Sequence, residues 1–164
     1  MHIIGFKCFN KNLTNRYGFQ YKIGKTYNAK GKIKFGNDGN GFHFCKNLED
    51  TLRYYDALKE QVDICLVVGF GNIVMYEDTY NEYYDMYASE NMIILRKLSR
   101  DEIIKYAYNL RWPRINRFLS GFLLTAEEIK IFKSKFYNKQ DIINTIEYYQ
   151  EGKLDTYTKK YIKK

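Results

Sequence analysis

The sequence predicts an α+β fold: an N-terminal mixed or antiparallel sheet with one helix, followed by a C-terminal bundle of three to four helices. Two observations lead to this prediction. Up to Leu98, short segments rich in β-branched and aromatic residues alternate with turns rich in glycine and asparagine, which is typical of strands. From Ser99 on, helix-capping motifs precede segments with helical spacing. We therefore expect a β-rich domain over residues 1–98 and a helical region over residues 99–164.

The first half of the β-rich domain contains four segments that favour extended structure. Their apolar residues are strand formers, and helix signals are missing. The turn 36–41 separates the last two segments, because its glycines and asparagines adopt positive φ at low cost. The predicted extended segments are His2–Phe9, Phe19–Tyr27 with a bend at Gly24, Lys32–Phe35 and Phe42–Cys45.

The second half of this domain begins with a predicted helix. Asn47 is a suitable N-cap, acids follow in the first turn, and helical spacing continues to about Lys59. The run Val62–Gly69 is almost entirely apolar, which predicts a central strand buried on both faces. We expect Gly69-Phe70-Gly71 to break that strand, with extended structure resuming over 73–76 and again over 91–98.

The helical region has clear start signals. Ser99 with Glu102, and Thr125 with Glu128, fit the capping box, in which a hydroxyl and an acid three residues later satisfy each other's backbone N–H groups. Pro113 suits the first turn of a helix. We expect helices over 99–109, from 113 on, over 125–136 and over 139–150, the last followed by Gly152 as a C-terminal stop.

Composition narrows the classes of protein. The chain has 164 residues, enough to bury a core without disulfides. Its three cysteines, Cys8, Cys45 and Cys65, are widely spaced within apolar stretches, so we expect buried free thiols. With only two histidines, no CxxC pair and no phosphate-binding loop, we expect neither a metal site nor a cofactor. The longest apolar run has strand length, which predicts no membrane contact and a cytoplasmic location in a host cell.

Charge is unevenly distributed along the chain. Residues 1–46 hold nine lysines and arginines against the single acid Asp38, whereas residues 47–98 hold four bases and ten acids. Residues 99–164 are again basic. Such blocks suit a basic face for nucleic acid or complementary surfaces for a protein partner. A lysine-rich but merely solvated surface is the alternative.

The most unusual segment is 76–87, with four acids and five tyrosines in twelve residues. Tyrosine is enriched at protein interfaces, and the acids suit docking against lysines and arginines. The alternative is a solvated loop or short helix. We predict that a partner, a host protein or a ribonucleoprotein complex, contacts this segment through Glu77, Asp78, Glu82, Tyr83, Tyr84 and Asp85.

A second candidate surface is basic. Lys30, Lys32 and Lys34 alternate along one predicted strand, and further arginines flank Trp112. Cations beside aromatic rings suit single-stranded RNA or DNA, through phosphate contacts and base stacking. A solvated face with Trp112 in the core is the alternative. The predicted nucleic-acid-binding residues are Lys30, Lys32, Lys34, Arg111, Arg114 and Arg117.

Two sequence blocks carry a resemblance to a known family. Gly18–Tyr27 (GFQYxxGKxY) and Gly41–Cys45 (GFHFC), with Gly5-Phe6-Lys7 before them and Tyr54-Tyr55 after them, resemble an uncharacterised domain common in phage and prophage proteins, over roughly residues 3–98. The resemblance implies a phage setting and no particular reaction. Small phage proteins of this size are often inhibitors of host defence, including anti-CRISPR proteins, so inhibition is what this setting suggests.

The order of elements is also similar to that of some ADP-ribosyltransferases: a glycine-aromatic strand, a helix with paired tyrosines, a buried strand, and an acid leading into a last strand. That similarity implies Glu90 as the carboxylate that stabilises an oxocarbenium-like centre. Met92 stands where a second acid is expected, and no arginine or histidine is well placed on the first strand. We therefore expect a non-enzymatic phage inhibitor that occupies a host nuclease or its nucleic-acid-binding surface. The alternatives are an ADP-ribosyltransferase-like enzyme and a nucleic-acid-binding module.

Overall fold

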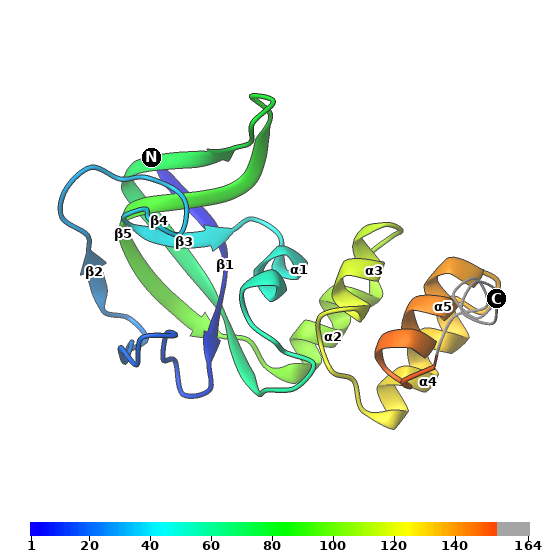
Figure 1. The fold of residues 1–164 in the computed structure, drawn as a ribbon. Coiled ribbons are helices and arrows are strands. Elements are labelled where there is room, and N and C mark those ends of the chain that lie inside the picture. The colour runs from blue at the N-terminus through cyan, green and yellow to red at the C-terminus, as the bar shows by residue number, and fades with distance from the viewer. Residues whose placement is uncertain (154–164) are drawn as a thin grey trace. The chain divides into compact units, whose positions relative to one another are not determined.

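The structure, a computed structural model, describes residues 1–153; the end of the predicted helical region, 154–164, lies outside the described residues. The chain divides into two compact units (Figure 1). The sheet unit contains residues 1–55 and 60–99. The helical unit contains the short segment 56–59 together with the chain from residue 100 on.

The sheet unit is built on five antiparallel strands in the described part of the chain, which confirms the α+β fold with its N-terminal sheet and C-terminal helices. Two of the strands, β4 and β5, are far longer than the others and form one hairpin. The strands are β1 (His2–Asn10), β2 (Thr26–Asn28), β3 (Phe42–Cys45), β4 (Val62–Glu77) and β5 (Tyr83–Lys97).

Four of these strands pair in a closed cycle. β1 pairs with β4 along its whole length, β4 pairs with β5, β5 pairs with β3, and β3 returns to β1 through Phe6 and Cys45. β2 adds to β5 beside β3. Closure leaves few unpaired strand edges and encloses an apolar interior. That interior holds aromatic rings from β1, β2, β3 and the segment before β2, including Phe9, Tyr21, Tyr27 and Phe44.

Two glycines permit this closure. A Cβ on Gly5 would lie 2.5 Å from the carbonyl oxygen of Cys45, so only glycine lets β3 approach β1 here. A Cβ on Gly69 would lie 2.4 Å from the ring of Phe44. The sequence block Gly5-Phe6-Lys7 therefore has a packing reason for its glycine.

The long hairpin differs from the sequence-based expectation. Gly69-Phe70-Gly71 does not end β4, because a bulge between Phe70 and Ile73 lets the strand continue, with Gly71 at φ +81°. β5 begins at Tyr83, eight residues before the predicted start at Asn91. The segment 76–87 is therefore neither a loop nor a helix but mostly paired strand around a short turn.

The helix expected from Asn47 to Lys59 is shorter than predicted. It consists of α1 (Leu48–Thr51) and a single 3₁₀ turn, η1 (Leu52–Tyr54), and Tyr55 is extended. The following residues pack in the helical unit, where the carbonyl of Ala57 accepts the N–H of Leu123 at 3.1 Å. That tertiary contact overrides the local helical spacing.

The strand expected over Lys32–Phe35 does not form. Only an isolated bridge joins Lys34 to Asn40, and the Asn40 side chain donates to the carbonyls of Lys30 and Lys32. Ile33 is buried and its lysine neighbours are exposed, so the alternation indicated burial correctly. The alternation gave no information about a partner strand, and none of the described strands pairs with the segment 32–35.

The helical unit begins with the four helices that follow the sheet: α2 (Arg100–Tyr108), α3 (Arg114–Leu119), α4 (Ala126–Lys135) and α5 (Gln140–Tyr149). Thr125 forms the predicted capping box with Glu128. The core consists of aromatic and branched side chains such as Phe118, Phe132 and Ile146, all fully buried. Among residues 1–153, no helix has the length and apolar character needed to cross a membrane.

Candidate functional site

The six residues predicted to bind a partner all lie at the end of the β4–β5 hairpin, which projects from the sheet unit (Figure 1). We call residues 76–87 the acidic hairpin. Tyr76 pairs with Tyr84 and Glu77 with Tyr83, and the turn spans the residues between them. Pairing thus places Glu77, Asp78, Glu82, Tyr83 and Tyr84 on one projecting end, with Asp85 just behind it on β5.

Asp78 organises the turn of the acidic hairpin. Its Oδ1 accepts the backbone N–H groups of Tyr80 and Glu82, at 2.8 and 3.0 Å. Its Oδ2 accepts the hydroxyl of Tyr84 at 2.9 Å. These hydrogen bonds lower the pKa of Asp78, the bond to the N–H of Glu82 first among them. Asp78 is therefore a charged turn residue rather than a freely moving surface acid.

Most of the other side chains near the turn of the acidic hairpin face solvent, whereas Met86 and Tyr87 at its base are buried. Tyr80 is 84% exposed and Tyr83 is 63% exposed, which is unusual for such large rings. Glu77 and Glu82 are exposed as well. Within residues 1–153, none of the four hairpin carboxylates forms an ion pair. The hairpin thus presents uncompensated negative charge beside exposed aromatic surface.

The residues predicted to bind nucleic acid separate into two sets. Lys30, Lys32 and Lys34 are exposed on the loop between β2 and β3 of the sheet unit. Arg111, Arg114 and Arg117 belong to the helical unit. There, Trp112 is not in the core but 63% exposed, and it lines a groove of about 760 Å³ with Arg111, Lys135 and Lys139.

Glu90 lies at the β4 bulge. Its Oε2 accepts the backbone N–H of Asn72 at 3.0 Å, and its own carbonyl accepts the N–H of Ala29. It lines neither the groove beside Trp112 nor the cavity between β1 and β3. The carboxylate implied by the similarity to ADP-ribosyltransferases therefore holds a backbone irregularity in place.

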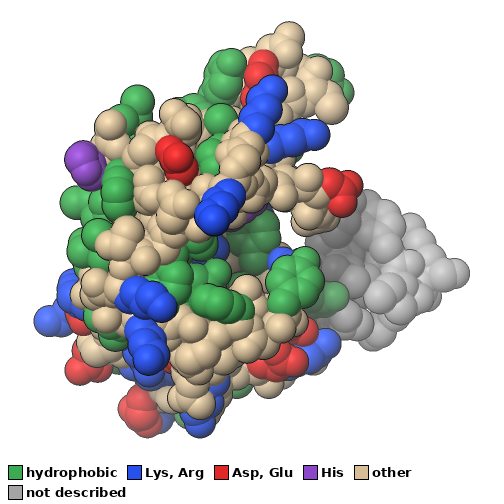
Figure 2. Space-filling model, turned by 90° about the vertical axis from the view of Figure 1, so that its left-hand side faces the viewer, with side chains coloured by type: hydrophobic (Ala, Val, Ile, Leu, Met, Phe, Trp, Pro, Cys, Tyr) green, Lys and Arg blue, Asp and Glu red, His purple; other side chains and the backbone are tan. Residues whose placement is uncertain are grey.

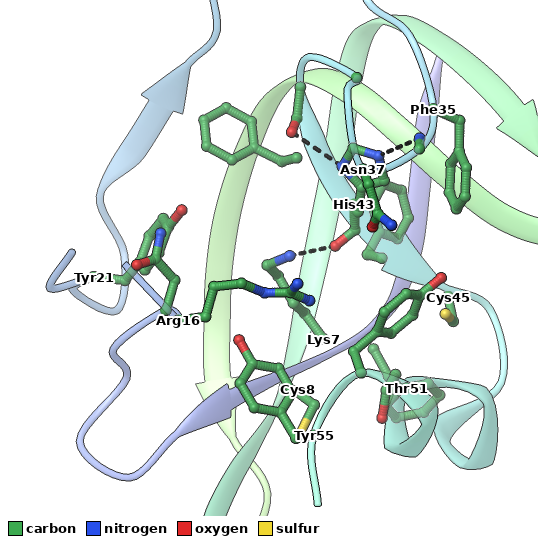
Figure 3. A pocket seen from close by; sticks show the side chains of 18 of the residues that line it. Lys7, Cys8, Arg16, Tyr21, Phe35, Asn37, His43, Cys45, Thr51 and Tyr55 are labelled. Carbon is green, nitrogen blue, oxygen red and sulfur yellow. Dashed lines mark hydrogen bonds between the residues drawn. The ribbon is translucent and has the colours of Figure 1, made fainter. Parts of the chain in front are cut away.

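A cavity in the sheet unit was not anticipated from the sequence. It has a volume of about 350 Å³ and lies between β1, β3, the loop 15–21, the glycine turn 36–41 and the two tyrosines at the end of η1 (Figure 3). Its polar lining includes Lys7, Arg16, Asn37 and His43, and tyrosines and phenylalanines supply much of the rest. We call this space the basic cavity, because its described lining contains no aspartate or glutamate.

Lys7 is the central cation of the basic cavity. It sits in the middle of β1, on the same side of the strand as the core residue Phe9. Its Nζ donates to the carbonyl oxygen of His43 and lies 5.7 Å from the ring centre of Phe9 (Figure 3). Burial lowers the pKa of Lys7 to about 8, because the charged form loses its hydration. A lysine in an otherwise apolar strand was the signal in the sequence that could have revealed this cavity.

His43 fixes the wall of the cavity. Its Nε2 accepts the backbone N–H of Gly36 at 3.0 Å, so its other nitrogen, Nδ1, carries the proton of the neutral ring and donates to the carbonyl of Gly41 at 3.2 Å. Burial lowers the pKa of His43, and the charge of Lys7 acts in the same direction. His43 therefore joins both ends of the glycine turn to β3 as a neutral group.

The three cysteines are buried free thiols, as predicted. Burial raises the pKa of Cys8, Cys45 and Cys65 to about 12, which disfavours thiolate chemistry even for the two that line the basic cavity. Over the described ranges, no three histidine, cysteine, aspartate or glutamate side chains gather closely enough to hold a metal ion.

Comparison with known proteins places the chain in a family. No curated protein and no solved structure matches it. A family described as "Domain of unknown function (DUF7666)" matches residues 3–106, a stretch that contains all five strands of the sheet unit, the acidic hairpin and the basic cavity. Since this stretch is more than half of the chain, the protein belongs to the DUF7666 family.

Proposed function

We propose that this protein is a phage-encoded binding protein that inhibits a host defence system, by placing the acidic hairpin on the nucleic-acid-binding surface of a nuclease. The observation that carries the proposal is the set of four carboxylates at a projecting hairpin end, none of them in an ion pair within the described chain.

The chemistry of the hairpin suits such a partner. Surfaces that bind nucleic acid are rich in lysine and arginine, because these residues neutralise phosphates. Carboxylates arranged along a narrow hairpin can take the place of those phosphates. The same carboxylates repel negatively charged surfaces, which favours basic partners. The exposed rings of Tyr80 and Tyr83 add contact area at low conformational entropy cost. The carboxylates therefore select a basic partner, and the tyrosine rings enlarge the contact area with it.

The proposed phage setting rests on the sequence blocks. GFQYxxGKxY and GFHFC resemble a domain of phage and prophage proteins, and both blocks fall within the stretch that matches the family. Inhibition of host defence, as by anti-CRISPR proteins, is common among small phage proteins, so the setting supports this role by analogy.

The test compares two variants with equal change in charge. Glu77→Lys with Glu82→Lys reverses two hairpin acids but spares Asp78, which holds the turn. Glu60→Lys with Glu127→Lys reverses two exposed acids elsewhere. Wild-type protein is used to capture partners from a host lysate, mass spectrometry identifies a captured nuclease, and cleavage of labelled DNA by that nuclease is measured.

We expect wild type and the control variant to inhibit cleavage, and the hairpin variant to lose at least about ten-fold in potency, because each charge-assisted contact contributes about 1.5–3 kcal/mol. Capture of no nuclease would contradict the proposal. So would a hairpin variant that inhibits as well as the control.

A second function, binding of single-stranded nucleic acid by the helical unit, is favoured by the exposure of Trp112 beside Arg111. Trp112 is the only tryptophan of the chain, so quenching of its fluorescence by an oligonucleotide reports stacking directly. We expect quenching that weakens steeply between about 50 and 200 mM salt. Fluorescence that an oligonucleotide leaves unchanged would contradict this function.

A further inference from the structure

The basic cavity has the size of a ligand site. Its volume of about 350 Å³ lies within the range of roughly 300–1,000 Å³ that is typical of small-molecule sites. Strands β1 and β3 form one wall, and the glycine turn 36–41 is held against them by His43 through both of its ring nitrogens. The walls are thus built on paired strands and a fixed turn, which favours a preformed site.

Two cations enter the cavity without a counter-charge. The guanidinium of Arg16 extends into the space between Lys7 and Tyr55 (Figure 3). In the part of the chain that the structure describes, neither Arg16 nor Lys7 pairs with a carboxylate. A half-buried ammonium without a carboxylate partner is costly, and the neighbouring guanidinium adds to the cost. Figure 2 shows one face of the molecule, on which lysine and arginine side chains are spread among hydrophobic, acidic and uncharged groups. An anion in the cavity would compensate Lys7 and Arg16 together.

Aromatic rings line the remainder of the cavity. Tyr17, Tyr21, Tyr54 and Tyr55 come from the two segments on either side of the cations, and Phe35 lies 4.6 Å from the ring centre of His43. Tyr17 is 83% exposed although it contributes to the lining, so its ring is available to cover a ligand. Tyrosine faces bind planar rings by stacking, and they do so without strong preference among bases.

From this combination we propose that the basic cavity binds a free nucleotide, with its phosphate on Lys7 and Arg16 and its base against the tyrosines. A phosphate alone would leave the aromatic lining unused, and a neutral aromatic ligand would leave the two cations uncompensated. A nucleoside monophosphate satisfies both features and has a size compatible with the cavity. This site is separate from the acidic hairpin, whose acids do not line the cavity.

The test is calorimetric titration with AMP, GMP, CMP and UMP, with inorganic phosphate and adenosine as partial ligands. We expect at least one monophosphate to bind about ten-fold or more tightly than either partial ligand, because it makes both sets of contacts. Absence of binding by all four monophosphates up to about 1 mM would overturn the proposal.

Variants locate the site. Lys7→Met and Arg16→Gln should each weaken binding about ten-fold or more, through loss of a charge-assisted contact. Lys22→Gln, which removes an exposed charge of the same unit outside the cavity, should leave it unchanged. Lys7→Met keeps the side-chain length, so we expect the variant to fold. Thermal unfolding checks that it does. Equal affinity of Lys7→Met, Arg16→Gln and wild type would place the ligand elsewhere and overturn the proposal.

A 5′-phosphorylated oligonucleotide distinguishes the source of the nucleotide. We expect it to bind more weakly than the monophosphate, because the cavity is walled by the turn 36–41 and the tyrosines. Tighter binding of the oligonucleotide would assign the site to the end of a strand and overturn the free-nucleotide assignment. The hairpin variant Glu77→Lys/Glu82→Lys should bind the monophosphate like wild type, so failure of this proposal is distinguishable from failure of the proposed inhibitor function.

Discussion

The acidic hairpin and the basic cavity, both in the sheet unit, differ in the sign of their charged side chains and in the direction in which these point. The hairpin turns its carboxylates outward at the end of β4 and β5, whereas the cavity turns Lys7 and Arg16 inward between β1 and the glycine turn. Within the described residues, none of the nine lysines and arginines of residues 1–46 forms an ion pair with an acid.

Within residues 1–153, the basic block 1–46 is therefore not neutralised through ion pairs with the acidic block 47–98. Ion pairs form instead between neighbours, as between Asp63 and Lys97 at 3.0 Å, or inside the helical unit between Arg100 and Glu128 at 2.7 Å. The hairpin carboxylates therefore remain available to bind a large basic surface. Lys7 and Arg16 remain available to bind a small anion.

The largest expected effect comes from Gly5→Ala, which disrupts the cavity wall. The new Cβ would lie 2.5 Å from the carbonyl oxygen of Cys45, so β3 must move away from β1. We expect a loss of about 3 kcal/mol in the free energy of unfolding, typical of a severe backbone clash, measured by chemical denaturation. Gly18→Ala, at a glycine with open space around it, is a milder control that strains only the backbone. Equal losses for both variants would contradict the close approach of β1 and β3.

Lys7→Met is expected to stabilise the protein while it weakens nucleotide binding. The pKa of Lys7 falls from 10.5 to about 8 on folding, so its penalty is fully present below pH 8 and is relieved as pH rises from 8 to 10.5. At pH 7 we expect the variant to gain about 2 kcal/mol in unfolding free energy. The difference between variant and wild type should shrink toward pH 10. A variant less stable than wild type at pH 7 would contradict the buried charge.

Acid should weaken the glycine turn through His43. The pKa of His43 is lowered on folding, so the unfolded chain takes up its proton first and stability falls as pH drops below about 6.5. Protonation also removes the lone pair that accepts the N–H of Gly36. Between pH 7.5 and 5 we expect wild type to lose about 1 kcal/mol more than His43→Gln, measured by urea denaturation. Parallel pH profiles would show that the turn does not depend on neutral His43.

The smallest effect on stability is expected for the hairpin variant Glu77→Lys/Glu82→Lys. Both carboxylates are exposed and unpaired, so the free energy of unfolding should change by no more than about 0.5 kcal/mol. Thermal unfolding measures this change, and a large loss of stability would mean that the acids support the hairpin rather than a partner.

Local signals predicted much of the fold. The capping box at Thr125 and the apolar run from Val62 depend on neighbouring residues, and both elements formed. The strand expected at Lys32–Phe35 did not form, because strand formation depends on a partner strand that neighbouring residues do not specify. The helix after Asn47 is short, because the residues that follow it, including Ala57, pack in the helical unit. Composition singled out the segment 76–87, but its hairpin conformation was not predicted. The basic cavity was missed because Lys7, Arg16 and His43 come together only when the strand cycle closes.

The most direct test of the proposed function is competition for a nuclease captured from the host lysate. Fluorescence anisotropy follows labelled DNA bound to a catalytically inactive form of that nuclease while each protein variant is added. We predict that wild type and Lys7→Met displace the DNA, and that Glu77→Lys/Glu82→Lys does not. Displacement by the hairpin variant at the same concentration as wild type would contradict a role for the acidic hairpin in occupying the DNA-binding surface.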